Sequence, residues 1–221
     1  MKAYKTLLAD ASAEFSIQKS RFIGNAAPVT TVEAALTFLE HVRRANREAN
    51  HHCYAYIIGQ NAGIMRYSDD GEPGGTAGIP ILEVMKARGI VDSIVVITRY
   101  FGGILLGAGG LVRAYSHTCA LALDAAKVCE MLPSQRWMFE VEYSLWDRVQ
   151  YALKGLPVRV ESTEFTASVN FGLLCRQADT QTLIDELIRV TDGRVERLMT
   201  EEMHAAWEEQ TAGEAVPDGH V

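Results

Sequence analysis

A strand, a glycine-rich loop and a helix follow one another directly between residues 93 and 126. Residues 93–100 (SIVVITRY) form an apolar, β-branched run that is typical of a buried strand. Residues 102–110 (GGILLGAGG) contain five glycines and are predicted to form a loop. Residues 111–126 then carry apolar side chains at helical spacing. This order predicts a mixed α and β protein in which the loop delivers the chain to the start of a helix.

The loop at residues 102–110 is the first candidate binding site. The backbone N–H groups at the start of a helix have no partner within the helix and attract anions such as phosphate or carboxylate. Glycines let a ligand approach the backbone, and two arginines flank the loop with positive charge. The predicted anion-binding residues are Arg99, Gly102, Gly103, Gly107, Gly109, Gly110 and Arg113. In the alternative interpretation, the glycines only permit the strand and the helix to pack closely.

Two familiar phosphate-binding motifs are absent from this loop. A nucleoside triphosphatase loop would end in Gly-Lys followed by Ser or Thr, and no such residues follow here. The six-residue glycine spacing of dinucleotide-binding proteins is also missing. The pattern therefore disfavours a nucleotide triphosphatase.

A second candidate lies in residues 67–80 (YSDDGEPGGTAGIP), where carboxylates gather in a turn-rich loop. The candidate residues are Ser68, Asp69, Asp70, Glu72 and Thr76. Three carboxylates are suited to a divalent cation or to acid–base chemistry, but Asp and Gly are also the usual residues of turns. We expect this loop to be structural with a role in binding, and we expect neither a metal nor a catalytic residue.

Two smaller groups are candidate contacts to nucleic acid. The first is Lys19 and Arg21, which form a basic turn between two strands, although the tip of a solvated hairpin has the same appearance. The second is His51 and His52 at the start of a predicted strand, where alternation sends the two side chains to opposite faces. The same alternation opposes a shared metal ion, and Cys53 is predicted to be a core residue.

Composition limits the class of protein. The chain has 221 residues, of which 48% are hydrophobic, so it is long enough to fold without a metal or disulfides. Its four cysteines lack metal-ligand spacing, and no apolar stretch is long enough to span a membrane. We therefore expect a reduced, cytoplasmic, globular protein that has no obligate cofactor and no membrane partner.

The chain divides into three parts by pattern and charge. Residues 1–133 have a net charge of +1, residues 134–200 of −2 and residues 201–221 of −6. We place a domain boundary at Leu132–Ser134 and predict domains at residues 1–133 and 134–203. Residues 204–221 have no sustained period, and we expect a poorly ordered acidic tail.

Each predicted domain has its own sequence of elements. In the first, strands are expected at residues 15–19, 22–28, 52–58 and 64–67, and a helix at residues 79–87. Thr30 and Glu33 match a capping box, which predicts a helix directly after them. In the second, strands at residues 137–144, 158–161, 166–174 and 194–199 alternate with two helices. That β-α-β-β-α-β order is typical of a ferredoxin-like fold.

Several of these segments together resemble the YigZ/IMPACT family. The resemblance covers roughly residues 15–126 and is carried by KSRFI at residues 19–23, HHC at 51–53, YSDDGEP at 67–73, GTAG at 75–78 and RYFGGILLG with GGLV at 99–112. The second domain is similar to the C-terminal domain of the bacterial members by its element order.

The resemblance implies an α+β protein of two domains. It implies that the N-terminal domain is like the second domain of ribosomal protein S-five, and that the C-terminal domain is ferredoxin-like, as in elongation factor G. Eukaryotic members regulate translation during amino-acid starvation, a role that bacterial members cannot take over whole because they lack the partner-binding domain. The resemblance supplies no catalytic residue.

Three hypotheses for the function follow. The first is a non-enzymatic translation-associated regulator that binds RNA, the ribosome or a ribosome-associated protein through the anion-binding loop. The second is a hydrolase or other enzyme that acts on a small phosphorylated or peptide substrate between residues 69–72 and residues 102–110. The third is a protein–protein docking module. Because many unrelated functions share one fold, the fold alone does not decide among them.

Overall fold

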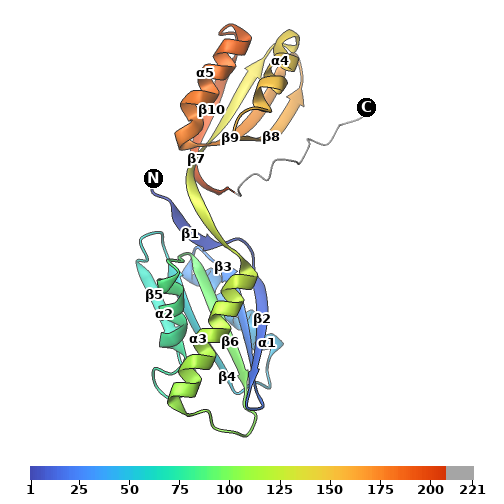
Figure 1. The fold of residues 1–221 in the computed structure, drawn as a ribbon. Coiled ribbons are helices and arrows are strands. Elements are labelled where there is room, and N and C mark those ends of the chain that lie inside the picture. The colour runs from blue at the N-terminus through green and yellow to red at the C-terminus, as the bar shows by residue number, and fades with distance from the viewer. Residues whose placement is uncertain (208–221) are drawn as a thin grey trace. The chain divides into compact units, whose positions relative to one another are not determined.

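The computed structural model describes residues 1–207 and has a mixed α+β fold (Figure 1). It divides into two compact units, Tyr4–Glu130 and a second that joins Met1–Ala3 to Met131–Trp207. The predicted α+β class with two domains is therefore confirmed. Among the described residues, no helix is both long and apolar enough to cross a membrane.

The N-terminal unit is built on a five-stranded sheet of order β2-β3-β6-β4-β5. Two helices cover one face, and a third helix covers the other (Figure 1). The central strand β6 is buried along nearly its whole length, as its apolar sequence predicts. The elements are β1 (Tyr4–Leu7), β2 (Ala11–Ile17), β3 (Ser20–Pro28), α1 (Val32–Ala45), β4 (His51–Ile58), β5 (Ile64–Ser68), α2 (Gly78–Ala87), β6 (Ser93–Tyr100) and α3 (Gly107–Ala126).

The two faces of this sheet have separate cores. Side chains from β3, β4 and β6 that point toward α2 and α3 include Phe22, Cys53 and Ile97. Their neighbours along each strand point toward α1 and include Tyr56 and Val96. Because successive side chains alternate between faces, each candidate residue on a strand is assigned to one face by its position.

Two local predictions in this unit are wrong. Thr31, not Thr30, caps α1, because the Thr31 hydroxyl accepts a hydrogen bond from the Ala34 N–H at 3.1 Å. The second half of the predicted loop at residues 102–110 is helical, because α3 begins at Gly107 and includes Gly109 and Gly110 in its first turn. Glycine is a poor helix former, so sequence pattern placed this start four residues too late.

The C-terminal unit has the predicted order β-α-β-β-α-β. Strands β7, β8, β9 and β10 pair in the order β8-β9-β7-β10, and β1 also neighbours β7 in this sheet. Phe139, Phe171 and Leu173 lie at the centre of its core. The elements are β7 (Val128–Val141), α4 (Tyr143–Leu153), β8 (Val158–Phe165), β9 (Val169–Arg176), the short 3-10 turn η1 (Gln177–Asp179), α5 (Thr180–Thr191) and β10 (Glu196–Ala206).

The boundaries of this unit differ from the predicted ones. The two units divide between Glu130 and Met131, inside the continuous strand β7, which runs through the predicted boundary at Leu132–Ser134. The last strand continues to Ala206, so residues 204–206 pair with β7 and are not part of a tail. The rest of the predicted acidic tail, residues 208–221, lies outside the described residues.

Candidate functional site

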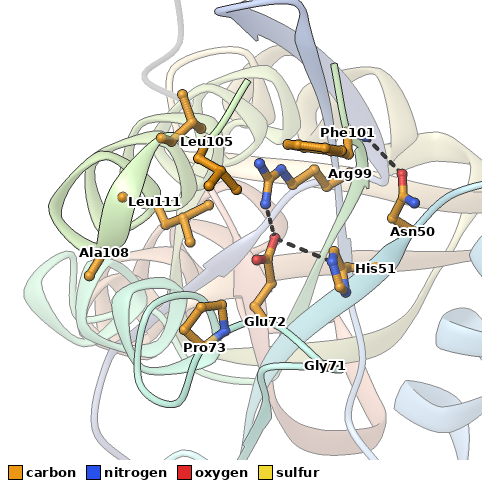
Figure 2. Close-up of a pocket in the computed structure, with 12 residues that line it drawn as sticks. Asn50, His51, Gly71, Glu72, Pro73, Arg99, Phe101, Leu105, Ala108 and Leu111 are labelled. Carbon is orange, nitrogen blue, oxygen red and sulfur yellow. Dashed lines mark hydrogen bonds and ion pairs between the residues drawn. The ribbon is translucent and has the colours of Figure 1, made fainter. Parts of the chain in front are cut away.

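A cavity of about 390 Å³ opens where α3 begins, and we call it the Arg99 cavity (Figure 2). Four parts of the N-terminal unit meet there: the start of β4, the loop after β5, the end of β6 and the first turn of α3. Both glycine-rich segments of the sequence therefore reach the same place. The lining residues are Asn50, His51, Gly71, Glu72, Pro73, Arg99, Phe101, Leu105, Leu106, Gly107, Ala108 and Leu111.

The first turn of α3 borders this cavity, and its backbone N–H groups have no side-chain cap. Leu106 occupies the N-cap position and provides no side-chain hydrogen bond, and the first turn contains no acidic residue. Gly107 and Ala108 are both exposed and both line the cavity. Gly107 has a φ of +70°, which favours glycine, so it admits the chain to the helix without a side chain in the way. Free N–H groups and the helix dipole make this turn attractive to an anion.

Arg99 contributes to the cavity as a buried, paired cation. Its Nη1 donates to Oε1 of Glu72 at 2.6 Å, and the two side chains are 6% and 3% exposed. Its Nε has no partner among the described residues. We expected Arg99 to flank the loop with positive charge, and Glu72 neutralises most of that charge. The positive potential at this wall of the cavity must therefore come chiefly from the backbone of α3.

His51 lies directly opposite Arg99 in the pairing of β4 with β6. Its Nδ1 is 2.8 Å from the carbonyl oxygen of Asp70, and because a carbonyl oxygen can only accept, Nδ1 carries the proton. Nε2 then lies 3.9 Å from Glu72 Oε1, and a dashed line joins the two side chains in Figure 2. His51 is thus held in one orientation at the wall of the cavity.

Two of the three carboxylates in the loop after β5, those of Asp69 and Asp70, accept hydrogen bonds from backbone N–H groups. Asp69 accepts hydrogen bonds from the N–H groups of Gly75, Ala77 and Gly78 at 2.8–3.1 Å, so its side chain caps α2. Asp70 accepts from the His52 N–H at 2.6 Å. Among residues 1–207, no group of three or more His, Cys, Asp or Glu side chains is arranged to hold a metal ion.

The two hydroxyl side chains of this loop also form hydrogen bonds with the backbone of the loop. Ser68 Oγ accepts a hydrogen bond from the Asp70 N–H at 3.1 Å. Thr76 Oγ1 donates to the carbonyl oxygen of Pro73 at 2.7 Å. Sequence grouped both with the carboxylates as one candidate cluster, but only Glu72 of that cluster lines the Arg99 cavity.

Cys53 and Tyr115 form a buried polar chain beneath the cavity. The Tyr115 hydroxyl donates to Glu72 Oε1 at 2.7 Å, and the Cys53 thiol lies 3.3 Å from the same hydroxyl. Burial raises the pKa of the Cys53 thiol to about 12. Burial also raises the pKa of Tyr115. Cys53 is a core residue, as predicted, and is not an activated nucleophile because it stays protonated near neutral pH.

The basic residues of the β2–β3 hairpin do not join the cavity. Arg21 alternates with Phe22 and so points to the α1 face, where both its Nε and Nη2 bond to Glu14 at 2.7 Å. Lys19 is exposed in the turn, with a φ of +63°. Its backbone is in contact with Gly102, where an added Cβ would lie 2.0 Å from the Lys19 carbonyl carbon. Gly102 is therefore required for close packing against the β2–β3 turn, whereas the alternative interpretation placed the close packing between the strand and the helix.

The remaining predicted residues lie at the edge of the site or behind it. Arg113 is exposed in the second turn of α3, and its Nε donates to the Gly109 carbonyl oxygen at 3.2 Å. Gly103 has a φ of +82° and open space around it. His52 follows the alternation onto the face of α1, and its Nε2 is 3.2 Å from the Asn46 carbonyl oxygen. The predicted contacts are thus split between two faces of the sheet.

Sequence reasoning missed three side chains that shape the cavity. The Asn50 side chain accepts a hydrogen bond from the Phe101 N–H at 2.8 Å and so fixes the chain after β6. The Phe101 ring is 43% exposed, with the Arg99 guanidinium carbon 5.5 Å from its centre. Leu105 is 85% exposed at the rim. Phe101 and Leu105 could have been found from the sequence, because large apolar side chains are unusual in a loop that is otherwise rich in glycine.

Comparison with known proteins identifies the family. Residues 18–123 match the Impact N-terminal domain, and residues 139–194 match a domain of unknown function (DUF1949). The chain is 34% identical to IMPACT family member YvyE of Bacillus subtilis, over 88% of this chain and 89% of that protein. The chain belongs to the IMPACT family. Another similar IMPACT family member is YigZ of Escherichia coli, at 34% identity over 84% of this chain and 92% of that protein.

Other IMPACT family proteins extend the comparison. A family member from Thermus thermophilus is 41% identical over 71% of this chain and 84% of its own length. A solved structure, described as a hypothetical protein, aligns with 90% of this chain and 97% of its own with a TM-score of 0.57 and 31% identity. The Arg99 cavity lies wholly within the segment that matches the Impact N-terminal domain.

Proposed function

We propose that this IMPACT family protein is a non-enzymatic, translation-associated regulator in the cytoplasm that binds RNA, either free or in the ribosome. A backbone phosphate of the RNA occupies the Arg99 cavity and accepts hydrogen bonds from the first turn of α3. The observation that carries the proposal is the uncapped start of α3, which opens into a cavity of about 390 Å³.

Two features of the cavity favour RNA over a small free anion. Phe101 lies half-exposed beside the buried Arg99, so a flat ring is available within reach of a bound phosphate. Aromatic rings beside a phosphate-binding backbone are a usual feature of proteins that bind single-stranded nucleic acid. Glu72 is already paired with Arg99, so its carboxylate does not repel the phosphate as an unpaired charge would.

The enzyme hypothesis has less support. Asp69 and Asp70 are used in holding backbone N–H groups, and the Cys53 thiol is protonated at neutral pH. The oriented His51 is the feature that favours an enzyme, since its Nε2 is free to accept a proton at the cavity wall. Hydrolysis of a phosphorylated or peptide substrate that is lost in Asp70→Ala, with folding intact, would favour the enzyme.

The test is binding of the full chain to a fluorescein-labelled single-stranded RNA and to purified ribosomes over a range of salt. We expect co-sedimentation with ribosomes at about 50 mM salt and release by about 200 mM. For the RNA, the logarithm of the affinity is expected to fall with the logarithm of salt with a slope of about −0.7 per phosphate neutralised. A flat salt dependence, or no binding to RNA and ribosomes at low salt, would rule the proposal out. Partners that survive nuclease and high salt would favour the docking module.

A further inference from the structure

A second cavity lies on the other side of Leu106, between β2 and α3, and we call it the Phe15 cavity. Its volume is about 520 Å³. Phe15 and Ile17 of β2 form one wall, and Arg113 and His117 of α3 form the other. Leu106 lines both cavities, so the two are neighbours across the start of one helix.

The walls of the Phe15 cavity combine flat apolar surface with positive charge. The Phe15 ring and the His117 ring meet edge to face, with centres 4.6 Å apart and planes at 75°. No residue that lines this cavity is acidic. A ligand that fits it therefore has a flat, largely apolar part and carries negative charge nearby.

Arg113 and Gln18 provide polar contacts at the rim. The Arg113 Nε is held by the Gly109 carbonyl oxygen, and within residues 1–207 its two terminal nitrogens form no hydrogen bond or ion pair. An arginine fork with free donors recognises paired acceptors such as those on the edge of a nucleobase. The Gln18 amide is exposed and can both donate and accept.

Residues from the same turn of α3 line both cavities. Gly107 lines the Arg99 cavity and Gly110 lines the Phe15 cavity. Gly107 and Gly110 are three positions apart in the helix, which corresponds to about 4.5 Å along its axis. A phosphate and the base of its own nucleotide are separated by a single sugar, so one nucleotide could reach both.

We propose that the Phe15 cavity binds the nucleobase of a single-stranded RNA whose phosphate occupies the Arg99 cavity. This inference rests on the proposed function and adds the recognition of an unpaired base. Only an unpaired base can enter the Phe15 cavity, because a base in a duplex is stacked between its neighbours and its edge is hydrogen-bonded to its partner base. The base packs against the surface formed by the touching Phe15 and His117 rings, and Arg113 contacts its edge.

The experiment compares two labelled oligomers on the full chain by fluorescence anisotropy: hexauridylate and an abasic ribose-phosphate hexamer of the same length. We expect hexauridylate to bind at least about fivefold more tightly, since stacking of one base on an aromatic ring contributes that much or more. Phe15→Leu and, separately, His117→Ala should weaken hexauridylate binding to the abasic level and leave abasic binding unchanged. A 4-thiouridine hexamer should crosslink to a peptide that contains Phe15 or His117.

The control is Phe165→Leu, which removes an exposed ring in the C-terminal unit. It should bind both oligomers as the unchanged protein does, and His117→Ala keeps the test valid if Phe15→Leu does not fold. Equal binding of both oligomers by the unchanged protein would overturn this inference and leave the proposed function standing. No binding of either oligomer at low salt would overturn the proposed function itself. Uridine monophosphate that competes as strongly as unlabelled hexauridylate at the same nucleotide concentration would overturn RNA as the occupant.

Discussion

Arg99 and Glu72 form a buried ion pair, with 2.6 Å between Nη1 and Oε1, that joins the end of β6 to the loop after β5. The same carboxylate oxygen accepts a hydrogen bond from Tyr115 on α3. One carboxylate therefore ties together three of the segments that surround the Arg99 cavity. Both the shape and the net charge of the Arg99 cavity therefore depend on the ion pair between Arg99 and Glu72.

Replacing Glu72 by Gln is expected to lower the free energy of unfolding by about 3 kcal/mol, because it leaves the buried Arg99 charge unpaired. The matched control is Glu83→Gln, which removes an exposed carboxylate paired with Lys86 and should change stability by less than about 0.5 kcal/mol. Urea denaturation of both variants measures the difference. If Glu72→Gln unfolds at the same urea concentration as the unchanged protein, the ion pair does not hold the site together.

Two Gly→Ala substitutions near the start of α3 should act in opposite directions. At Gly102 an added Cβ would lie 2.0 Å from the Lys19 carbonyl carbon, so Gly102→Ala should cost at least about 2 kcal/mol. At Gly109 nothing lies within 4 Å, and alanine is the better helix former, so Gly109→Ala should stabilise by up to about 1 kcal/mol. Thermal unfolding of the two variants checks this. Similar melting temperatures would mean that Gly102 is not at a close approach.

The cap on α2 predicts a graded effect at Asp69. Asp69→Ala removes the acceptor of three backbone N–H groups and should destabilise by about 1–2 kcal/mol. Asp69→Asn keeps one oxygen, which can still accept from Ala77 and Gly78, so it should cost clearly less. Chemical denaturation compares the two. An equal loss in both variants would show that the negative charge, and not the hydrogen bonds, is what matters at this position.

Stability should fall at alkaline pH because of two buried thiols. Burial raises the pKa of Cys53 and of Cys119 to about 12 each, whereas both thiols titrate near their ordinary value once the chain unfolds. The folded state thus keeps protons that the unfolded state loses, and this contribution to stability is complete below about pH 8.5 and declines as the pH rises toward 12. The urea midpoint should drop between about pH 8 and pH 10.5. Cys119→Ala should make that decline shallower, and a midpoint that rises with pH would contradict the pKa directions.

The sequence predicted those parts of the fold that local pattern determines. The strand at residues 93–100 is found with the expected bounds because its apolar β-branched run has no other reasonable interpretation. The β-α-β-β-α-β order of the C-terminal unit is found for the same reason. The start of α3 was misplaced because its first turn is made of glycines, which local propensity assigns to a loop.

The candidate site was less predictable because it depends on contacts between distant segments. Asp69 caps a helix that begins nine residues later, and Glu72 meets Arg99 from 27 residues away. Nothing local shows that Arg99 is paired or that Asn50 fixes the chain after β6. The sequence predicted that Arg21 and Arg99 contribute to one binding surface. In the structure their side chains point to opposite faces of the sheet.

Ala108 offers the most direct test of the claim that the start of α3 binds phosphate. It is exposed in the first turn and lines the Arg99 cavity (Figure 2). Ala108→Asp adds a carboxylate at the wall where we propose that the phosphate binds, and the helix dipole favours that charge, so folding is not harmed. Ala108→Asn has the same shape without the charge. The measurement is the affinity of the two variants for labelled single-stranded RNA at low salt. We expect Ala108→Asp to bind the RNA at least about tenfold more weakly than Ala108→Asn, and to melt at the same temperature or a higher one. Equal affinity of the two variants for RNA would contradict it.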